Sequence, residues 1–197
     1  MALSESKLRS EIKNAFKKGK ELRNDKPRYT KNDVANFLAD AIVSYASDAE
    51  IQISAPSTLL STVPATLGTP DVASSGQRLS VANPQPGKAS LASSIVVSFN
   101  AMDVGMVVLT PAIVAYAATL FSFKNTAGTI TATGASVMAA PPVLAPALAI
   151  GAGGGSEDDV VRMMSSIIHA SFKSVLFTGV GNNIAPLATG PVIGPLI

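Results

Sequence analysis

The side chains best suited to chemistry lie in one short stretch, where three consecutive acids precede a histidine. Glu157, Asp158 and Asp159 follow Ser156, and His169 comes soon after them. Clustered carboxylates could bind a metal ion or exchange protons with a substrate. Acids are also favoured in the first turn of a helix, because the helix dipole is positive at that end. We interpret the triplet as structural.

His169 is the only histidine of the chain, and there is no cysteine. Thiolate metal sites and disulfides are therefore excluded, and a lone imidazole lacks the partners that a metal site or a nucleophile–histidine pair needs. A histidine beside the apolar face of its helix is more often hydrogen-bonded and structural than catalytic. We predict no catalytic residue, no metal ligand, no cofactor and no small-molecule substrate. An enzyme is the third of three alternatives.

Two further patterns could suggest binding of phosphate or nucleic acid. The glycine run 151–155 has the composition of a phosphate-binding loop, but no Lys-Ser or Lys-Thr pair follows it, and the acids after it would repel a phosphate. Lys13, Lys17 and Lys20 form a basic stripe, but acids interleave with them and no aromatic stacking platform accompanies them. We predict a flexible hinge and a solvated helix face, and nucleic acid is not an expected partner.

Charge is distributed unevenly along the chain. Residues 1–50 hold 10 of the 15 Lys and Arg and 8 of the 13 Asp and Glu, and the net charge is only +2. The rest of the chain is about 7% charged, against roughly 25% in a typical soluble domain. A free monomer needs a charged surface without large apolar patches to avoid association. We expect this part of the chain to be covered by other protein chains.

Apolar periodicity and capping residues predict five helices. Three of them follow caps at Ser4, Thr30 and Ser156. A further helix is expected over about 89–109, and Thr110-Pro111 predicts the start of another, because proline suits the first position of a helix.

Between and after these helices the chain is rich in proline and glycine. A short strand is expected at 51–54, followed by an extended arm, and an exposed strand or hairpin arm at 127–136. An extended connector is expected at 140–156, and an extended uncharged tail from residue 178 onwards.

The predicted fold class is α+β and mainly α, with amphipathic helices, short strands and long extended Pro/Gly-rich arms. Residues 1–50 are predicted to form a charged N-terminal helical pair, and 51–88 an extended arm or linker. Residues 89–197 are predicted to form a charge-poor helical core with an extended C-terminal tail.

The stretch Val104–Phe123 contains twenty uncharged residues, about the length of a bilayer-spanning helix. Pro111 interrupts it, no Lys/Arg cluster flanks it, and the uncharged character continues into Pro- and Gly-rich backbone that lipid could not satisfy. Burial against protein explains the stretch better. A membrane-active phage lysis or entry protein that uses Val104–Phe123 is the alternative.

The order and composition of the segments resemble the small virion structural proteins of tailed bacteriophages. The likeness rests on an SESKLRSEIKNAF helix, a helix ending LADAIVSYASDAEIQI, a Pro/Thr/Ala/Gly-rich arm, and a C-terminal helix that runs into TGVGNNIAPLATGP. The resemblance implies a tail, neck or baseplate component, assembled in the host cytoplasm and located in the virion. Its partners would be copies of itself and other virion structural proteins.

On this hypothesis the contacts lie in the arms and the tail. A heterologous head-to-tail interface would close a ring or build a tube and would hide the uncharged faces. We expect a mostly apolar interface above about 2,000 Å². The residues expected to form it are Leu59, Leu60, Val63, Ile184, Leu187, Val192 and Ile193.

Overall fold

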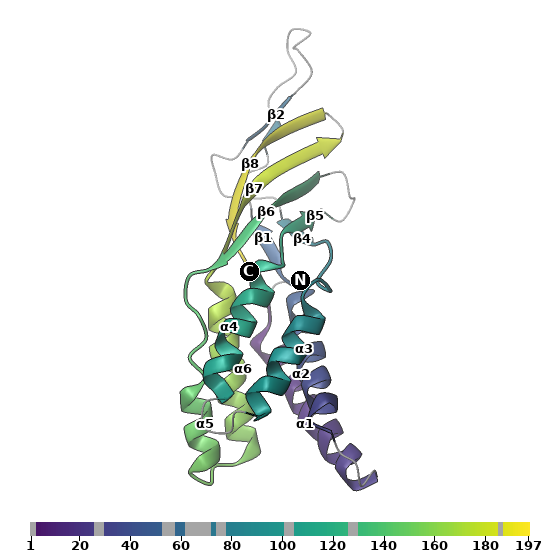
Figure 1. Cartoon of the computed structure of the whole chain (residues 1–197). Coiled ribbons are helices and arrows are strands. Elements are labelled where there is room, and N and C mark those ends of the chain that lie inside the picture. The colour runs from purple at the N-terminus through teal and green to yellow at the C-terminus, as the bar shows by residue number, and fades with distance from the viewer. Residues whose placement is uncertain are drawn as a thin grey trace.

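The chain forms an elongated molecule with its helices gathered at one end and its sheet at the other (Figure 1). The computed structural model describes residues 3–25, 30–52, 58–61, 72–73, 78–100, 105–125, 130–184 and 187–197. The helices are α1 Glu5–Asp25, α2 Lys31–Ala46, α3 Lys88–Asn100, α4 Gly105–Ala118, α5 Ala145–Ala152 and α6 Glu157–Lys173. The strands are β1 Glu50–Gln52, β2 Thr58–Ser61, β3 Val72–Ala73, β4 Arg78–Val81, β5 Ser122–Lys124, β6 Ile130–Met138, β7 Val175–Ile184 and β8 Leu187–Pro195.

The strands form one antiparallel sheet in the order β1-β4-β5-β6-β7-β8-β2-β3. The sheet curls so that β1 meets the end of β8. Ile51 bridges to Leu196, and Glu50 and Ile197 exchange two backbone hydrogen bonds of 3.3 and 2.8 Å. Six strands, β1 and β4 to β8, therefore make a nearly closed barrel, and β2 and β3 extend the sheet beyond β8.

The barrel interior is filled from alternate positions of its strands. Phe123 of β5 and Phe177 of β7 are fully buried, and their rings meet edge to face with centroids 4.8 Å apart. Ile51 and Leu79 from the short strands are also fully buried. This alternation is what an antiparallel sheet with one covered face requires.

A glycine pair allows the long strands β6 and β7 to curl. Gly134 lies directly opposite Gly179 in the register. A Cβ on Gly179 would overlap the carbonyl oxygen of Thr133 and lie 2.7 Å from Cζ of Phe177. Backbone and ring occupy the space that any side chain would need, so only glycine fits.

The helices pack on one another and on the end of the barrel. α4 is tied to its surroundings by Tyr116, whose hydroxyl donates to the carbonyl of Pro84 over 2.8 Å, and by Thr119, which donates to the carbonyl of Pro86 over 2.7 Å. Buried Ser136 of β6 donates to the carbonyl of Leu120 just after α4. The helical end and the barrel thus share one hydrophobic core.

The predicted mainly α fold class is wrong, because the chain is mixed α/β with a barrel-like antiparallel sheet. The expected exposed arm at 127–136 contributes β6 in the middle of the sheet, and the expected extended tail forms the hairpin β7–β8. The Leu196 N–H donates to the carbonyl of Val175 in β7. Backbone groups of successive residues in a strand point in opposite directions, so the nitrogens of Pro191 and Pro195 point away from β7. β8 therefore tolerates these prolines without losing a hydrogen bond to β7.

Several helix boundaries also differ from the predictions. α4 begins at Gly105, so Pro111 lies inside it rather than at its first position. The expected connector 140–156 contains the short helix α5. β1 covers 51 and 52 of the strand expected at 51–54, and 53 and 54, with much of the arm predicted for 51–88, lie outside the described residues. The caps at Thr30 and Ser156 are confirmed, since their side chains accept from the amides of Asp33 and Asp159.

Candidate interaction surface

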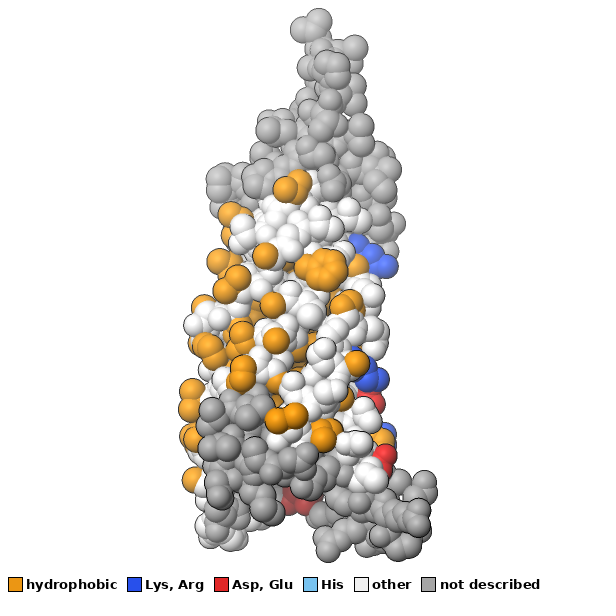
Figure 2. Space-filling model, viewed as in Figure 1, with side chains coloured by type: hydrophobic (Ala, Val, Ile, Leu, Met, Phe, Trp, Pro, Cys, Tyr) orange, Lys and Arg blue, Asp and Glu red, His pale blue; other side chains and the backbone are white. Residues whose placement is uncertain are grey.

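One side of the molecule exposes side chains that are nearly all uncharged. We call it the neutral face: the exposed residues of α3, α4, β6 and the connection from β6 to α5, with Phe121 between α4 and β5. Its charged exception among the described side chains is Lys88 at the start of α3, which pairs with Asp40 of α2 at 2.5 Å. Figure 2 shows this face, with charged side chains along its right edge and lower end.

Large apolar side chains stand out on the neutral face. Val97 is 52% exposed, Phe121 47%, Val137 64% and Val143 67%. Alanine, serine, threonine and proline fill most of the remaining positions. These side chains are uncharged, and the serine and threonine hydroxyls are their polar groups.

The sequence of α4 explains why the face is apolar. A surface helix normally turns a polar side to water, and a helix that is apolar all round is a buried one. The buried side of α4 carries Ile113 and Tyr116, and its exposed side carries Pro111, Ala115 and Ala118. α4 therefore has the composition of a buried helix on a side that the chain itself leaves open.

The neutral face is large enough for a protein contact. α4 has 14 residues and β6 has 9, and they follow one another along the long axis (Figure 1). At the usual rise per residue they span roughly 50 Å, and with α3 beside α4 the width is roughly 20 Å. The outline of the face is therefore on the order of 1,000 Å², similar to the roughly 800 Å² that each partner buries in a stable interface.

A second apolar surface lies on the outer side of strands β7 and β8, and we call it the outer strand face. Leu176 is 45% exposed, Val180 52% and Ile193 44%. Leu176 pairs with Pro195 and with Val137 of the neutral face, so the two surfaces adjoin. No charged residue follows Lys173 in the sequence, which leaves this face uncharged as well.

The residues predicted to form an interface fall partly on the outer strand face. Ile193 is exposed there, whereas Val192 is fully buried inside the barrel and not available to a partner. Ile184 and Leu187 pair with each other at the tip of the β7–β8 hairpin.

The remaining predicted interface residues lie on the neighbouring part of the chain. Leu60 of β2 pairs with Thr189 of β8, and Leu59 pairs with Val72 of β3. Val63 lies outside the described residues. The absence of charge through Val104–Phe123 predicts that this stretch is covered by protein, but none of the interface residues named from the sequence lies on the neutral face.

The charged side chains gather on α1, α2 and α6. Lys7 pairs with Asp48 at 2.5 Å, and Lys13 pairs with Asp158 at 2.9 Å. The hydrogen bond from Lys13 holds the pKa of Asp158 below its usual value. In the part of the chain that the structure describes, no three His, Asp or Glu side chains could hold a metal ion together.

His169 is hydrogen-bonded rather than free. Its Nδ1 lies 2.7 Å from the hydroxyl of Tyr45, and the Tyr45 ring is completely buried. Burial lowers the pKa of His169, with Lys173 acting in the same direction and Glu5 opposing. Burial also raises the pKa of Tyr45 well above its ordinary value. A buried neutral phenol bonded to a neutral imidazole is a structural pair.

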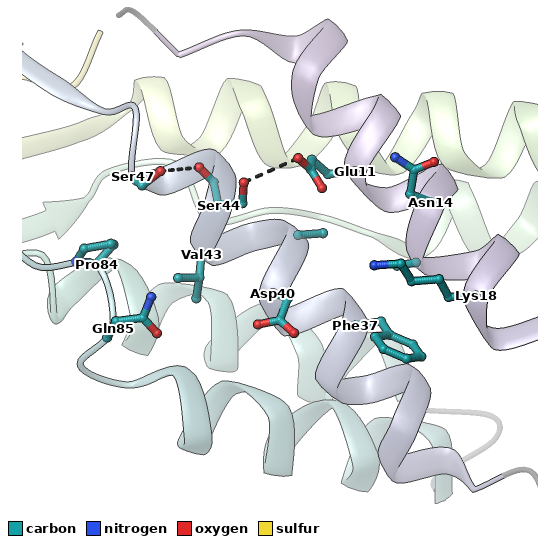
Figure 3. A pocket seen from close by; sticks show the side chains of 12 residues that line it. Glu11, Asn14, Lys18, Phe37, Asp40, Val43, Ser44, Ser47, Pro84 and Gln85 are labelled. Carbon is teal, nitrogen blue, oxygen red and sulfur yellow. Dashed lines mark hydrogen bonds between the residues drawn. The ribbon is translucent and has the colours of Figure 1, made fainter. Parts of the chain in front are cut away.

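A groove of about 310 Å³ runs between α1 and α2 (Figure 3). Glu11, Asn14 and Lys18 line it from α1, and the connection from β4 to α3 closes one end. Both of its carboxylates have partners within the chain: the Ser44 hydroxyl donates to Glu11 at 3.4 Å, and Asp40 pairs with Lys88. These contacts use the charged groups that a cationic ligand would otherwise bind.

Comparisons of the chain with protein-family models, with curated proteins and with solved structures found no match. What the chain does must be argued from its own surface.

The uncharged stretch Val104–Phe123 does not form a single long helix. Within the described residues it is divided between α4, a turn and β5, and Tyr116, Leu120 and Phe123 are buried in the chain's own core. Among the helices the structure describes, none combines the length and the apolar character needed to cross a membrane.

Proposed function

We propose that this chain is a non-enzymatic structural subunit of a multimeric assembly, and that the assembly is the virion of a tailed bacteriophage, in its tail, neck or baseplate. The observation that carries the proposal is the neutral face, a broad surface with exposed Val97, Phe121, Val137 and Val143.

The physical reason is the cost of leaving such a surface in water. Apolar area removed from water contributes about 25 cal/mol per Å², so burial of the four exposed large apolar side chains of this face favours association. Part of this gain offsets the lost freedom of the partners. A chain that worked alone would be expected to carry charges on this face, as it does on α1, α2 and α6.

The narrower assignment to a phage virion rests on the sequence resemblance. The charged N-terminal helix pair, the Pro-rich arm and the neutral Gly- and Pro-rich C-terminal segment occur in the order that such proteins show. On this proposal the partners are copies of the chain and other virion structural proteins.

The membrane-active alternative gains no support from the fold. It requires Val104–Phe123 to enter a membrane as one continuous segment. In the described residues this stretch packs against α3 and β6 instead.

The proposal is tested by asking whether the chain is built into particles. Phage particles from a host expressing the gene with its neighbouring genes are purified on a density gradient, and their proteins are quantified by mass spectrometry. The proposal predicts the chain at a fixed number of copies per particle. Intact particles that lack the chain, with all of it in the soluble lysate, would contradict the virion assignment.

A further inference from the structure

We propose that the neutral face packs against the same face of a second copy of this chain, so that two subunits are related by a two-fold axis. The inference rests on the proposed function as a multimeric subunit, and it names the partner and the surface that the contact uses.

The first step is charge complementarity. A charged side chain that is buried against an uncharged surface loses its water and gains no counter-charge, which costs several kcal/mol. The exposed sides of α1 and α6 carry Arg9, Lys13, Lys17, Arg162 and Lys173. These helices are therefore poor partners for the neutral face.

The second step is the choice among the uncharged surfaces. The described chain offers two, the neutral face and the outer strand face. The outer strand face consists of the exposed positions of β7 and β8, and two strands are only about 10 Å wide. A stable interface buries about 800 Å² on each partner, and the neutral face has that area by itself.

The third step is the fit of the two faces. A two-fold contact joins the same patch on both subunits, so the patch must be complementary to itself. Among the described side chains of α4, residues 109–118, the exposed ones are Pro111, Ala115 and Ala118. Small residues let two helices approach closely, and α4 of one copy can cross α4 of the other with the valines of α3 and β6 packing around them.

This geometry differs from the head-to-tail interface expected from the sequence. A heterologous contact would place the neutral face against a different surface of the next subunit, either the charged helices α1 and α6 or the narrower outer strand face. The two-fold contact buries uncharged area against uncharged area and leaves the ion pairs of α1, α2 and α6 in water.

The test uses two exposed aliphatic side chains. Val97 on the neutral face is 52% exposed, and Ile193 on the outer strand face is 44% exposed and is separated from β6 by β7. Val97→Glu places two like charges in the proposed contact, whereas Ile193→Glu places a charge outside it. We expect the mass of the Val97→Glu multimer, measured by sedimentation, to fall at least twofold, and the mass of the Ile193→Glu multimer to stay unchanged. Circular dichroism and melting temperature confirm that each variant is folded.

The outcomes separate this inference from the proposed function. A multimeric wild type that Ile193→Glu dissociates and Val97→Glu does not would overturn the two-fold contact and leave the multimeric subunit standing. A wild type that is monomeric at every concentration would overturn both.

Cross-linking tests the symmetry directly, because the chain has no cysteine. Ala115→Cys and Val137→Cys place single thiols on the neutral face, and Ser10→Cys places one on the exposed side of α1 as a control. With a short bis-maleimide we expect covalent dimers, and nothing larger, from either neutral-face variant and none from Ser10→Cys. Multimers in which neither neutral-face thiol cross-links would overturn the two-fold arrangement, even if the glutamate variants proved unstable.

Discussion

The hydroxyl of Tyr45 in α2 and Nδ1 of His169 in α6 lie 2.7 Å apart and join two helices that are far apart in the sequence. The Tyr45 ring also meets Phe172 edge to face at 5.5 Å. Tyr45→Phe keeps the ring contact and removes the hydrogen bond. We expect the free energy of unfolding in urea to fall by about 1 kcal/mol. His169→Gln, which can still bond to Tyr45, should cost less, and a Tyr45→Phe variant as stable as wild type would contradict a structural role for the pair.

The same pair predicts how stability depends on pH. Burial holds the pKa of folded His169 below the value near 6.5 of the unfolded chain, so the unfolded state binds protons more readily in this window. Stability is therefore expected to fall as pH decreases from about 6.5, before most carboxylates titrate. Urea denaturation at a series of pH values between about 7.5 and 5 measures the slope. His169→Gln should flatten it, and an unchanged slope in that variant would assign the effect to another group.

Gly179 is expected to be intolerant of any side chain. In Gly179→Ala the new methyl group would overlap the carbonyl oxygen of Thr133 and press on the ring of Phe177. Overpacking of this kind typically costs about 1–3 kcal/mol, and a clash with backbone places the expected loss at the upper end. Gly154→Ala is the matched control: Gly154 has a φ of +80° with nothing within 4 Å of the added carbon, so only the backbone cost of about 1–2 kcal/mol applies. Thermal denaturation compares the two, and a smaller loss at Gly179 would contradict the observed curl of β6 and β7.

The elements that local chemistry specifies were predictable from the sequence. Thr30 and Ser156 cap helices because a short hydroxyl side chain satisfies free amides at a helix start, a contact within three residues. The acids after Ser156 serve the helix start as predicted, with Asp159 bonded to Ser156. His169 was expected to be a hydrogen-bonded structural residue, and its contact with Tyr45 agrees with this.

The sheet was not predictable, because its signals are long-range. β7 and β8 contain glycine and proline at positions that favour an irregular tail by local rules, and they become strands by pairing with each other and with β6. The bridge between Ile51 and Leu196 closes the barrel by joining residues that are far apart in the sequence, and no local pattern predicts such a contact. Proline suits the first position of a helix, which predicts a helix start at Pro111, whereas in the fold α4 continues through this residue.

The sequence predicts that the chain has an uncharged exposed surface, but it does not predict which residues form that surface. The scarcity of charge after residue 50 indicated uncharged exposed area, and the structure has such area. Which residues carry it depends on tertiary packing: Val192 turns into the barrel while Val137 and Val143 face outward. Adjacent positions of a strand point to opposite faces, so the strand register determines which side chains are exposed, and the local sequence does not reveal this register.

The mass of the purified chain in solution shows whether the neutral face is a contact between copies. Sedimentation velocity over a hundredfold range of concentration, at moderate salt, measures this mass without cross-linking or labels. We expect an even multiple of the 20.0 kDa subunit that persists in high salt, because the contact is apolar rather than ionic. A sharp monomer of 20.0 kDa at every concentration, with the neutral face open to water, would contradict it.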